Sequence, residues 1–303
     1  MASVVDTSLP AKPTGAAAAF AASHAAEHDL KLYGGWFCPF VQRAWVVLHE
    51  KRIAHQYVEI NPYHKSAEFL ALNPRGLVPT LAVPRATAGR GDGDGDGDGD
   101  GGGIGGEKPL YESTIICEYL DEAYGDESAH GPALLPRGDA PADVYLRARC
   151  RLWIDHIGGK VVPAFYKMLQ HTPDKAHSMA EARREFLAHA RTLVREMGAG
   201  GPWFLGARFS LVDVMLAPWA KRLFLIDHYK PGGVGIPTAG EEEEEDAEVW
   251  DRWRLWFDAI TQRQSVKDTW SDDEMYIRSY KRYAEDTTES EVGRATRKGE
   301  RLP

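Results

Sequence analysis

Residues 32–51 read LYGGWFCPFVQRAWVVLHEK, and this stretch decides the fold of the first half of the chain. A short apolar strand at about 29–34 should lead into a helix, and Pro39 suits the first helical position, where its missing N–H costs nothing. Apolar residues recur behind it at helical spacing, namely Phe40, Val41, Ala44, Trp45, Val47 and Leu48. The stretch therefore predicts a strand, a turn that carries Cys38, and an amphipathic helix that begins at Pro39.

Cys38 is the residue in this stretch with reactive chemistry. Directly before the helix it should face the N–H groups of the first helical turn, at the positive end of the helix dipole. Such a setting lowers the pKa of a thiol from about 8.5 to roughly 3.5–7.5, which gives a nucleophilic thiolate at neutral pH. Taken alone, a cysteine before a helical proline fits a buried packing residue equally well.

The segments that follow complete a small α/β domain. The composition of 54–61 predicts a strand, 65–72 a short helix, 77–83 a second strand, 108–112 a third, and 114–124 a helix. Pro79 lies inside the apolar strand 77–83, which indicates an edge, a bulge or a cis turn. This order predicts a thioredoxin-like domain over 29–126 with a mixed four-stranded sheet, in which the last two strands form a hairpin.

The second half predicts an all-α helical domain over 138–285. Segments 143–169, 176–197, 211–229 and 247–263 carry apolar residues at helical spacing, and a further helix is expected near 272–283. Ser210 and Asp213 have the spacing of a capping box before a buried helix. We expect a disordered, Ala-rich tail at 1–28, of which 16–28 could be helical, and a polar tail at 286–303.

Two low-complexity stretches interrupt these domains. Residues 89–106 read GRGDGDGDGDGDGGGIGG and lie between the hairpin strands, and an acidic insertion at about 231–247 contains EEEEED. Both are expected to be flexible, because they cannot bury enough apolar surface to offset the entropy of ordering. Asp96 to Glu107 fits the literal pattern of a calcium-binding EF-hand loop, but Gly-Asp repetition produces such matches by chance, and we expect no metal site.

Composition and charge argue against a nucleic-acid-binding protein, a membrane-spanning protein and a disulfide-rich secreted protein. The chain has 303 residues and a net charge of −9, with no basic stripe for nucleic acid. No apolar run approaches the roughly 20 residues of a membrane helix. Three cysteines make no disulfide framework, and Cys117 and Cys150 fall on apolar helix faces. We expect an intracellular, cytoplasmic protein in a reducing setting.

Two further positions predict a ligand for the thiol. The backbone beside Val78-Pro79 is available to pair with an extended peptide. Glu112-Ser113 stands at the start of the next helix, where the serine hydroxyl and the first N–H groups suit a carboxylate and Glu112 suits an ammonium. Together they describe a pocket for a small peptide that contains cysteine, and glutathione is the obvious candidate.

The chain resembles the glutathione transferase superfamily, and within it the cysteine-type omega-like class. The residues that carry the resemblance are WFCPFVQR at 36–43, NPRGLVPTL at 73–81, LYESTIICEYLDEAYG at 110–125, ALLP at 133–136 and SLVDVMLAPWAKRL at 210–223. It covers about residues 29–285. The resemblance implies that Cys38 forms a mixed disulfide with glutathione. It implies a glutathione site lined by Phe40, Lys65, Val78, Pro79, Glu112 and Ser113, and an acceptor pocket lined by Trp36, Tyr166, Trp219 and Arg222.

The resemblance also implies an activity and partners. It implies thioltransferase, dehydroascorbate reductase and deglutathionylation activity, with glutathione as co-substrate, a small electrophilic, disulfide or glutathionylated acceptor, and a homodimer as one arrangement. The long Gly-Asp tract, the poly-Glu insertion and Arg75, which stands where an apolar or small residue is usual, depart from the pattern. A glutathionyl-quinone reductase, a redox-sensing or membrane-inserting relative of the chloride intracellular channel type, and a scaffold protein that keeps the fold remain alternatives.

Overall fold

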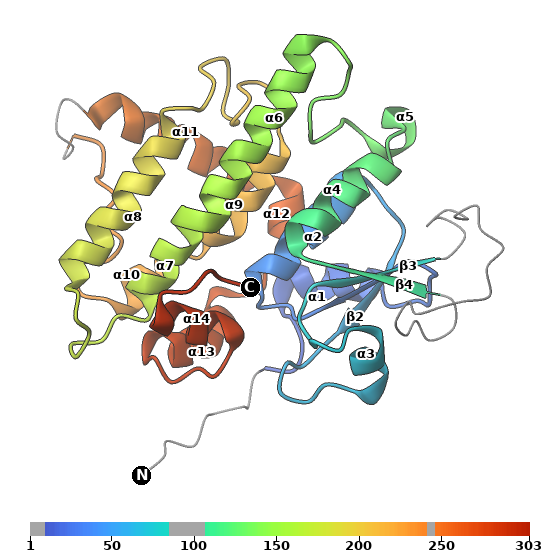
Figure 1. Ribbon diagram of the computed structural model, residues 1–303, viewed down its shortest axis with the longest axis horizontal. Helices are drawn as coiled ribbons and strands as arrows, with labels where there is room; N and C mark the ends of the chain where they lie inside the picture. The colour runs from blue at the N-terminus through green and yellow to red at the C-terminus, as the bar shows by residue number, and fades with distance from the viewer. Residues whose placement is uncertain (1–9, 85–106, 241–245) are drawn as a thin grey trace. The chain divides into compact units, whose positions relative to one another are not determined.

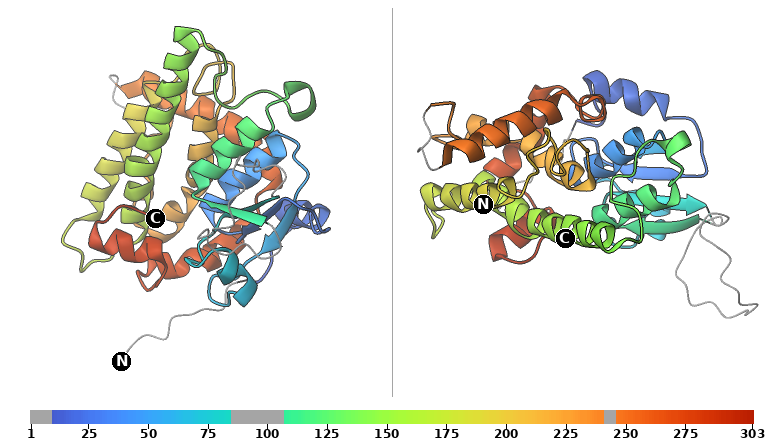
Figure 2. Two further views of the ribbon diagram at one scale, coloured as in Figure 1. Left: turned by 45° about the vertical axis from the view of Figure 1, so that its right-hand side comes forward. Right: turned by 90° about the horizontal axis from the view of Figure 1, so that it is seen from above.

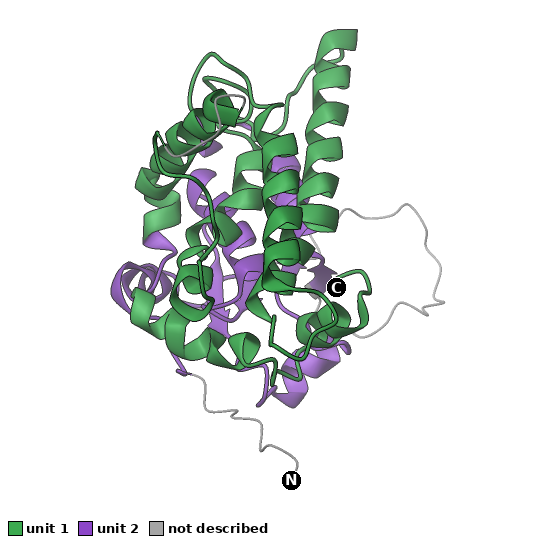
Figure 3. Cartoon of the chain, turned by 90° about the vertical axis from the view of Figure 1, so that its left-hand side faces the viewer, with its two compact units in different colours: residues 1–9, 133–267, 272–303 green, residues 10–132, 268–271 purple. Residues whose placement is uncertain are grey.

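The computed structural model describes residues 10–84, 107–240 and 246–303 (Figure 1). The chain divides into two compact units, coloured separately in Figure 3. The described part of unit 2 is 10–84, 107–132 and 268–271, and that of unit 1 is the rest. The predicted N-terminal domain, 29–126, is therefore too short at its beginning and lacks the distant segment 268–271.

Unit 2 contains the predicted thioredoxin-like layout. Its elements in chain order are α1 Gly15–Ser23, β1 Lys31–Gly34, α2 Pro39–Glu50, β2 Gln56–Glu59, α3 Ala67–Leu72, β3 Thr80–Pro84, β4 Glu107–Tyr111, α4 Ser113–Ala123 and α5 Glu127–His130. The strand order is β2-β1-β3-β4, with β1 parallel to β2 and the other two pairs antiparallel. The prediction of a mixed four-stranded sheet is confirmed.

The two faces of the sheet are covered by different helices, because side chains alternate along a strand. On one face α2 packs so closely on β1 that a Cβ at Gly34 would lie 2.4 Å from Cγ1 of Val41. Trp45 of α2 stacks on Tyr57 of β2 on this same face. The helix α4 lies beside α2 (Figures 1 and 2). On the other face Tyr33 stacks on Phe69 of α3.

The helix α1 corrects the prediction of a disordered tail over 1–28. Phe20 packs against the rings of Trp45 and His49, and the N–H of Ala17 donates to the carbonyl of Trp270. These contacts reach residues far away in the sequence, so local composition does not indicate them, although the composition of 16–28 is compatible with a helix. Residues 1–9 lie outside the described part of the chain.

Unit 1 is helical, as predicted. Its elements are α6 Pro141–His156, η2 Ile157–Val161, α7 Val162–Leu169, α8 Met179–Val194, α9 Leu211–Lys221, α10 Phe224–Tyr229, α11 Ala247–Gln262, α12 Gln264–Asp268, whose last residue belongs to unit 2, α13 Asp273–Ala284 and α14 Glu291–Lys298. The elements α6, η2 and α7 follow one another as one long helical rod (Figures 1 and 2). The helix α14 corrects the predicted tail at 286–303: the hydroxyl of Ser290 caps it by accepting from the N–H of Gly293.

The predicted capping box begins α9 and is confirmed. The Oδ2 of Asp213 accepts from the N–H of Ser210 at 2.8 Å and from its hydroxyl at 2.7 Å. The Oδ1 accepts from the N–H of Phe204 at 2.8 Å and from the indole N–H of Trp256 at 2.9 Å. The buried carboxyl of Asp213 thus joins the start of α9 to the loop before it and to α11.

The Gly-Asp insertion predicted at 89–106 and the acidic residues 241–245 lie outside the described residues. Among the helices that are described, none combines the length and hydropathy that crossing a membrane requires.

Candidate functional site

Cys38 lies where the sequence placed it, as the N-cap residue of α2, with Pro39 as the first helical residue. Its N–H donates to the carbonyl of Gly35 at 2.9 Å, which closes the turn after β1. The side chain is half-buried and forms no disulfide with another described cysteine. The first turn of α2 carries no acidic side chain. The helix dipole therefore favours negative charge at the sulfur.

The backbone that faces Cys38 comes from the loop before β3. Its carbonyl at Val78 lies 4.0 Å from the Sγ of Cys38, and the Val78–Pro79 peptide bond is cis. The side-chain amide of Asn73 braces this loop, because its Nδ2 donates to the carbonyl of Leu77 and to the hydroxyl of Thr80. Of the three alternatives predicted for Pro79, an edge, a bulge or a cis turn, the structure has the cis turn.

The pairing of the strands places a third connection, the one from β4 to α4, at the same edge of the sheet. Tyr33 of β1 pairs with Thr80 of β3, and Thr80 pairs with Tyr111 of β4. The turn after β1, the cis-proline before β3 and the helix after β4 therefore lie at one end of three neighbouring strands. Cys38, Pro79 and Glu112 belong to these three connections, so the structure assembles the predicted catalytic and peptide-binding positions within unit 2.

Glu112 is the N-cap residue of α4 and has a φ of +73°, which is rare for a residue with a side chain. Such strain is found mainly at functional sites. Its Oε1 accepts from the Nη1 of Arg75 at 3.1 Å, and both side chains are about half exposed. Arg75, noted in the sequence as a departure, is thus the ion-pair partner of the predicted ammonium-binding carboxylate.

Ser113 is buried in the first turn of α4, and its hydroxyl accepts from the Nη1 of Arg43 at 3.1 Å. The guanidinium of Arg43 also lies 5.5 Å from the centre of the Phe40 ring. The sequence analysis did not select Arg43, which is 3% exposed. A cation within the largely apolar stretch 40–48 of α2 was the signal that could have indicated it.

Lys65 lies before α3 and reaches toward the same loop. A Cβ placed on Gly76 would lie 2.9 Å from both the Cδ and the Nζ of Lys65, so the lysine side chain covers this glycine. Gly76 has a φ of +63°, which only glycine adopts without strain. Lys65 and Arg75 therefore place two cations beside the loop that carries the cis-proline.

Glu59 is a second residue that sequence analysis missed. It ends β2, and its Oε1 accepts from the N–H of Trp36 at 3.0 Å while its Oε2 accepts from the hydroxyl of Tyr57 at 2.9 Å. Burial raises the pKa of Glu59 to about 7, against the opposing effect of these two donors. Glu59 thereby fixes the turn that leads to Cys38.

The four residues predicted to line an acceptor pocket are all buried. The indole N–H of Trp36, in unit 2, donates to the carbonyl of Pro10 at 2.9 Å. Arg222, in unit 1, donates to the hydroxyl of Tyr280 at 3.1 Å and to the carbonyl of Pro218 at 2.7 Å. Tyr166 lies against the ring of Tyr283, and Trp219 is 1% exposed. Their assignment to a pocket stays a prediction.

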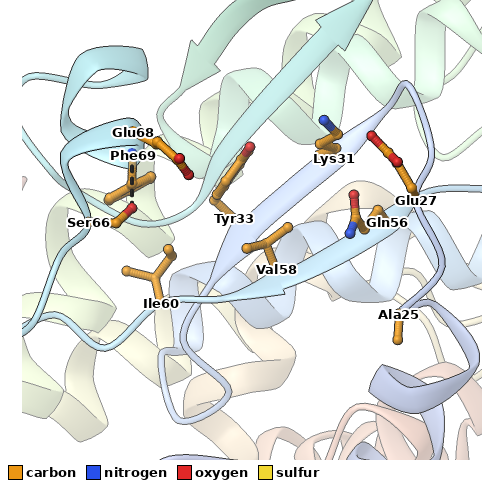
Figure 4. A pocket seen from close by; sticks show the side chains of 10 residues that line it. All are labelled: Ala25, Glu27, Lys31, Tyr33, Gln56, Val58, Ile60, Ser66, Glu68 and Phe69. Atoms are coloured by element: carbon orange, nitrogen blue, oxygen red, sulfur yellow. Dashed lines mark hydrogen bonds between the residues drawn. The ribbon is translucent and has the colours of Figure 1, made fainter. Parts of the chain in front are cut away.

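A groove of about 440 Å³ lies elsewhere in unit 2, on the face of the sheet that α3 covers (Figure 4). Its floor is formed by Tyr33 and Val58 of the strands, and Ser66 and Phe69 form one end. None of the predicted site residues lines it.

The other two cysteines are fully buried. Burial raises the pKa of the Cys117 thiol, and it raises that of Cys150 to about 11. Both thiols are therefore protonated and inaccessible at neutral pH, which agrees with their prediction as inert packing residues. In the described part of the chain, no three side chains of histidine, cysteine, aspartate or glutamate form a group able to hold a metal ion.

Comparison with known families agrees with this arrangement. The family model for the N-terminal domain of glutathione S-transferase matches residues 37–123, and that for the C-terminal domain matches residues 176–259. The first match contains Cys38, the cis-proline loop and the start of α4. The chain belongs to the glutathione transferase superfamily, in its omega-like class.

Individual relatives support the class. The chain is 32% identical to glutathione S-transferase omega-1 of Sus scrofa over 196 residues, which cover 64% of this chain and 67% of the relative. Glutathione transferase Omega 3C of Trametes versicolor is 36% identical, with a TM-score of 0.69 over 92% of this chain and all of that one. Rice GST1, solved in complex with glutathione, is 26% identical, with a TM-score of 0.64 over 87% of this chain and all of that one.

Proposed function

We propose that this protein is a glutathione-dependent thiol transferase and reductase that works through a mixed disulfide between Cys38 and glutathione. The observation that carries the proposal is the position of Cys38 at the N-terminus of α2, 4.0 Å from the carbonyl of Val78 beside a cis-proline. A serine or tyrosine at this position would stabilise bound glutathione as a thiolate. A cysteine instead becomes the disulfide partner of glutathione.

The reaction proceeds by two thiol–disulfide exchanges. The thiolate of Cys38 attacks the glutathione sulfur of a glutathionylated acceptor, so that the Cys38–glutathione disulfide forms and the acceptor leaves as its thiolate. The thiolate of a second glutathione then attacks the glutathione sulfur of this disulfide. Glutathione disulfide leaves and the Cys38 thiolate is restored. No CxxC motif provides a resolving cysteine next to Cys38, so the second thiol must come from solution.

The surrounding residues have roles in holding the peptide. The backbone of Val78 next to Pro79 pairs with the cysteinyl part of glutathione, in the manner of an added strand. Ser113 and the first N–H groups of α4 receive the γ-glutamyl carboxylate, and Glu112 receives the ammonium. Lys65 is suited to the second carboxylate, and Phe40 packs against the ligand.

The acceptor side is proposed on resemblance. The acceptors are small disulfides, glutathionylated or electrophilic molecules, and dehydroascorbate. The last is reduced by two glutathiones, which leave as glutathione disulfide. A reducing compartment such as the cytoplasm supplies the reduced glutathione that this chemistry needs.

We also propose a homodimer. Large apolar side chains are exposed where β4 meets α4, at Tyr111 and Ile115, and along α6, at Val144, Tyr145 and Leu152. Such side chains in groups favour a protein interface. Light scattering coupled to size-exclusion chromatography tests the proposal, and a single species at the monomer mass of 33.6 kDa would contradict it.

The mechanism is tested by incubation with glutathione disulfide followed by intact-mass measurement. We expect the wild type to gain the mass of one glutathionyl group and Cys38→Ser to gain none, because Cys117 and Cys150 are buried. The same two proteins are then assayed for glutathione-coupled reduction of a small mixed disulfide, where only the wild type should turn over. An adduct on Cys38→Ser, or none on the wild type, would overturn the mechanism.

A further inference from the structure

One buried cation connects the two helices whose N-termini form the proposed site. Arg43 lies on α2, the helix that begins after Cys38, and only 3% of its surface is exposed. Its Nη1 donates to the hydroxyl oxygen of Ser113, on α4, at 3.1 Å. Its guanidinium lies 5.5 Å from the centre of the Phe40 ring, a third residue of the proposed glutathione site.

The direction of this hydrogen bond has a consequence for Ser113. A guanidinium has donors only, so the serine oxygen must accept, and the serine hydrogen remains to be donated elsewhere. The side chain of Glu112, the N-cap residue, makes no capping bond to α4. The N–H groups of the first turn have no acceptors within the helix and point in the direction of its axis. Ser113 is therefore oriented as a donor at a helix end that favours anions.

The charge of Arg43 acts in the same direction. A fixed positive charge behind the first turn of α4 adds to the positive end of its dipole, and burial weakens the screening of that charge by water. Arg43 is also near the second turn of α4, since its charge opposes the effect of burial on the Cys117 thiol. The arginine thus favours an anion at the N-terminus of α4 without itself lying at the surface.

We propose that Arg43 is the positioning residue of the carboxylate subsite. It orients the Ser113 hydroxyl and supplies the charge that makes the site prefer thiol peptides with an α-carboxylate on the γ-glutamyl group over peptides that lack it. This inference rests on the proposed function, because it concerns the same glutathione site.

The test uses two ligands that differ only in this carboxylate. S-methylglutathione cannot form a disulfide, and S-methyl-(4-aminobutyryl)-cysteinylglycine is the same molecule without the α-carboxylate. The Kd of each is measured by calorimetry for the wild type, Arg43→Met and Arg43→Lys. We expect Arg43→Met to raise the Kd of S-methylglutathione about tenfold and that of the second ligand less than twofold. Arg43→Lys, which keeps the charge, should give a Kd for S-methylglutathione between those of the wild type and Arg43→Met.

Two further variants separate positioning from support of the fold. In the Ser113→Ala background, Arg43→Lys should raise the Kd of S-methylglutathione little further, because the hydrogen bond is already absent. This comparison can be made even where Arg43→Met does not fold. Arg252→Lys is the matched control: Arg252 is a half-buried arginine of unit 1 that donates to the carbonyls of Pro202, Gly198 and Trp203. It should leave the ratio of the two Kd values unchanged.

Equal weakening of both ligands by the Arg43 variants would overturn the inference, since a merely structural role does not distinguish the carboxylate. Additive effects of Arg43→Lys and Ser113→Ala would overturn it as well. Failure of the wild type to bind S-methylglutathione would instead overturn the proposed function, and the inference with it.

Discussion

Lys51 and Asp121 form an ion pair from which water is excluded, with 3.3 Å between Nζ and Oδ1 and exposed fractions of 0% and 1%. The ammonium also lies 3.4 Å from the carbonyls of Gly131 and Pro132. Lys51 follows directly on α2, and Asp121 lies in the last turn of α4. The two helices that present Cys38 and Ser113 at their N-termini are therefore joined at their other ends by a buried pair of charges.

Removal of one partner should be strongly destabilising, because it leaves the other charge buried and uncompensated. We expect Lys51→Met or Asp121→Asn to lower the free energy of unfolding by about 3–5 kcal/mol. Urea denaturation measures this change. The double variant Lys51→Met/Asp121→Leu should lose less than the sum, since no charge remains. Glu285→Gln, which breaks the exposed pair with Lys281, is the control and should cost less than about 1 kcal/mol.

His55 should make the protein sensitive to acid. Burial lowers its pKa to about 4 in the folded protein, from 6.5, and the stacked ring of His24 adds to the effect. The unfolded chain therefore binds a proton at a higher pH than the folded one does, and stability falls as the pH decreases from 6.5 to 4, by about 3 kcal/mol in all.

The variant His55→Phe should lack this part of the pH dependence, even if it is less stable at neutral pH through loss of the bond from Nδ1 to the carbonyl of Ile53. Urea denaturation at several pH values between 4 and 7 provides the comparison. Parallel curves for the two proteins would show that His55 is not the group responsible.

Glu59 should have the opposite pH dependence. Its folded pKa of about 7 lies above the ordinary 4.5, so its contribution to stability is complete below pH 4.5 and is lost as the pH rises through 7. We expect Glu59→Gln, which keeps an acceptor for the N–H of Trp36, to be more stable than the wild type at pH 8 by up to about 3 kcal/mol. Thermal unfolding at pH 5 and pH 8 checks this, and a wild type equally stable at both pH values contradicts it.

Arg75 should compete with glutathione for Glu112. The pair is exposed, so Arg75→Gln should change the free energy of unfolding by less than about 1 kcal/mol. With the carboxylate released, we expect glutathione to bind about two- to fivefold more tightly. Titration calorimetry with S-methylglutathione measures it, and Glu112→Gln should show the opposite effect. Weaker binding to Arg75→Gln would mean that the guanidinium contacts the ligand itself.

Asp213→Asn tests the start of α9. Each carboxyl oxygen of Asp213 accepts two hydrogen bonds, so the amide nitrogen of an asparagine, which is itself a donor, would face two donors. We expect a loss of about 2–3 kcal/mol in the free energy of unfolding. Ser210→Ala removes one of the four donors and should cost about 1 kcal/mol. A similar cost for both variants would argue against the buried network.

The sequence predicted those features that local patterns determine. Pro39 marks the start of α2, Ser210 and Asp213 mark the start of α9, and Pro79 marks the bend before β3, each within a few residues. The order of strands and helices along the chain was sufficient to predict the mixed four-stranded sheet, because connections in such domains follow few topologies.

Partners distant in the sequence were what local patterns could not indicate. Local patterns single out neither Arg43 nor Lys51, but both are buried, with partners at Ser113 and Asp121. Their acceptors come from segments distant in the sequence: α4 provides Ser113 and Asp121, and the residues after α5 provide the carbonyls of Gly131 and Pro132. The contacts of α1 are of the same kind, since Trp270, which accepts its hydrogen bond, lies far away in the sequence.

The segment 268–271, which belongs to unit 2, has a consequence for synthesis on the ribosome. Thr269 accepts from the side-chain amide of Gln42, Trp270 accepts from the N–H of Ala17, and Ser271 accepts from the N–H of Thr14. Translation proceeds at roughly 5–20 residues per second, so these acceptors emerge on the order of ten seconds after residue 132. Unit 2 is therefore completed only after residues 133–267 have been synthesised, and until then its α1 and α2 lack acceptors that segment 268–271 provides.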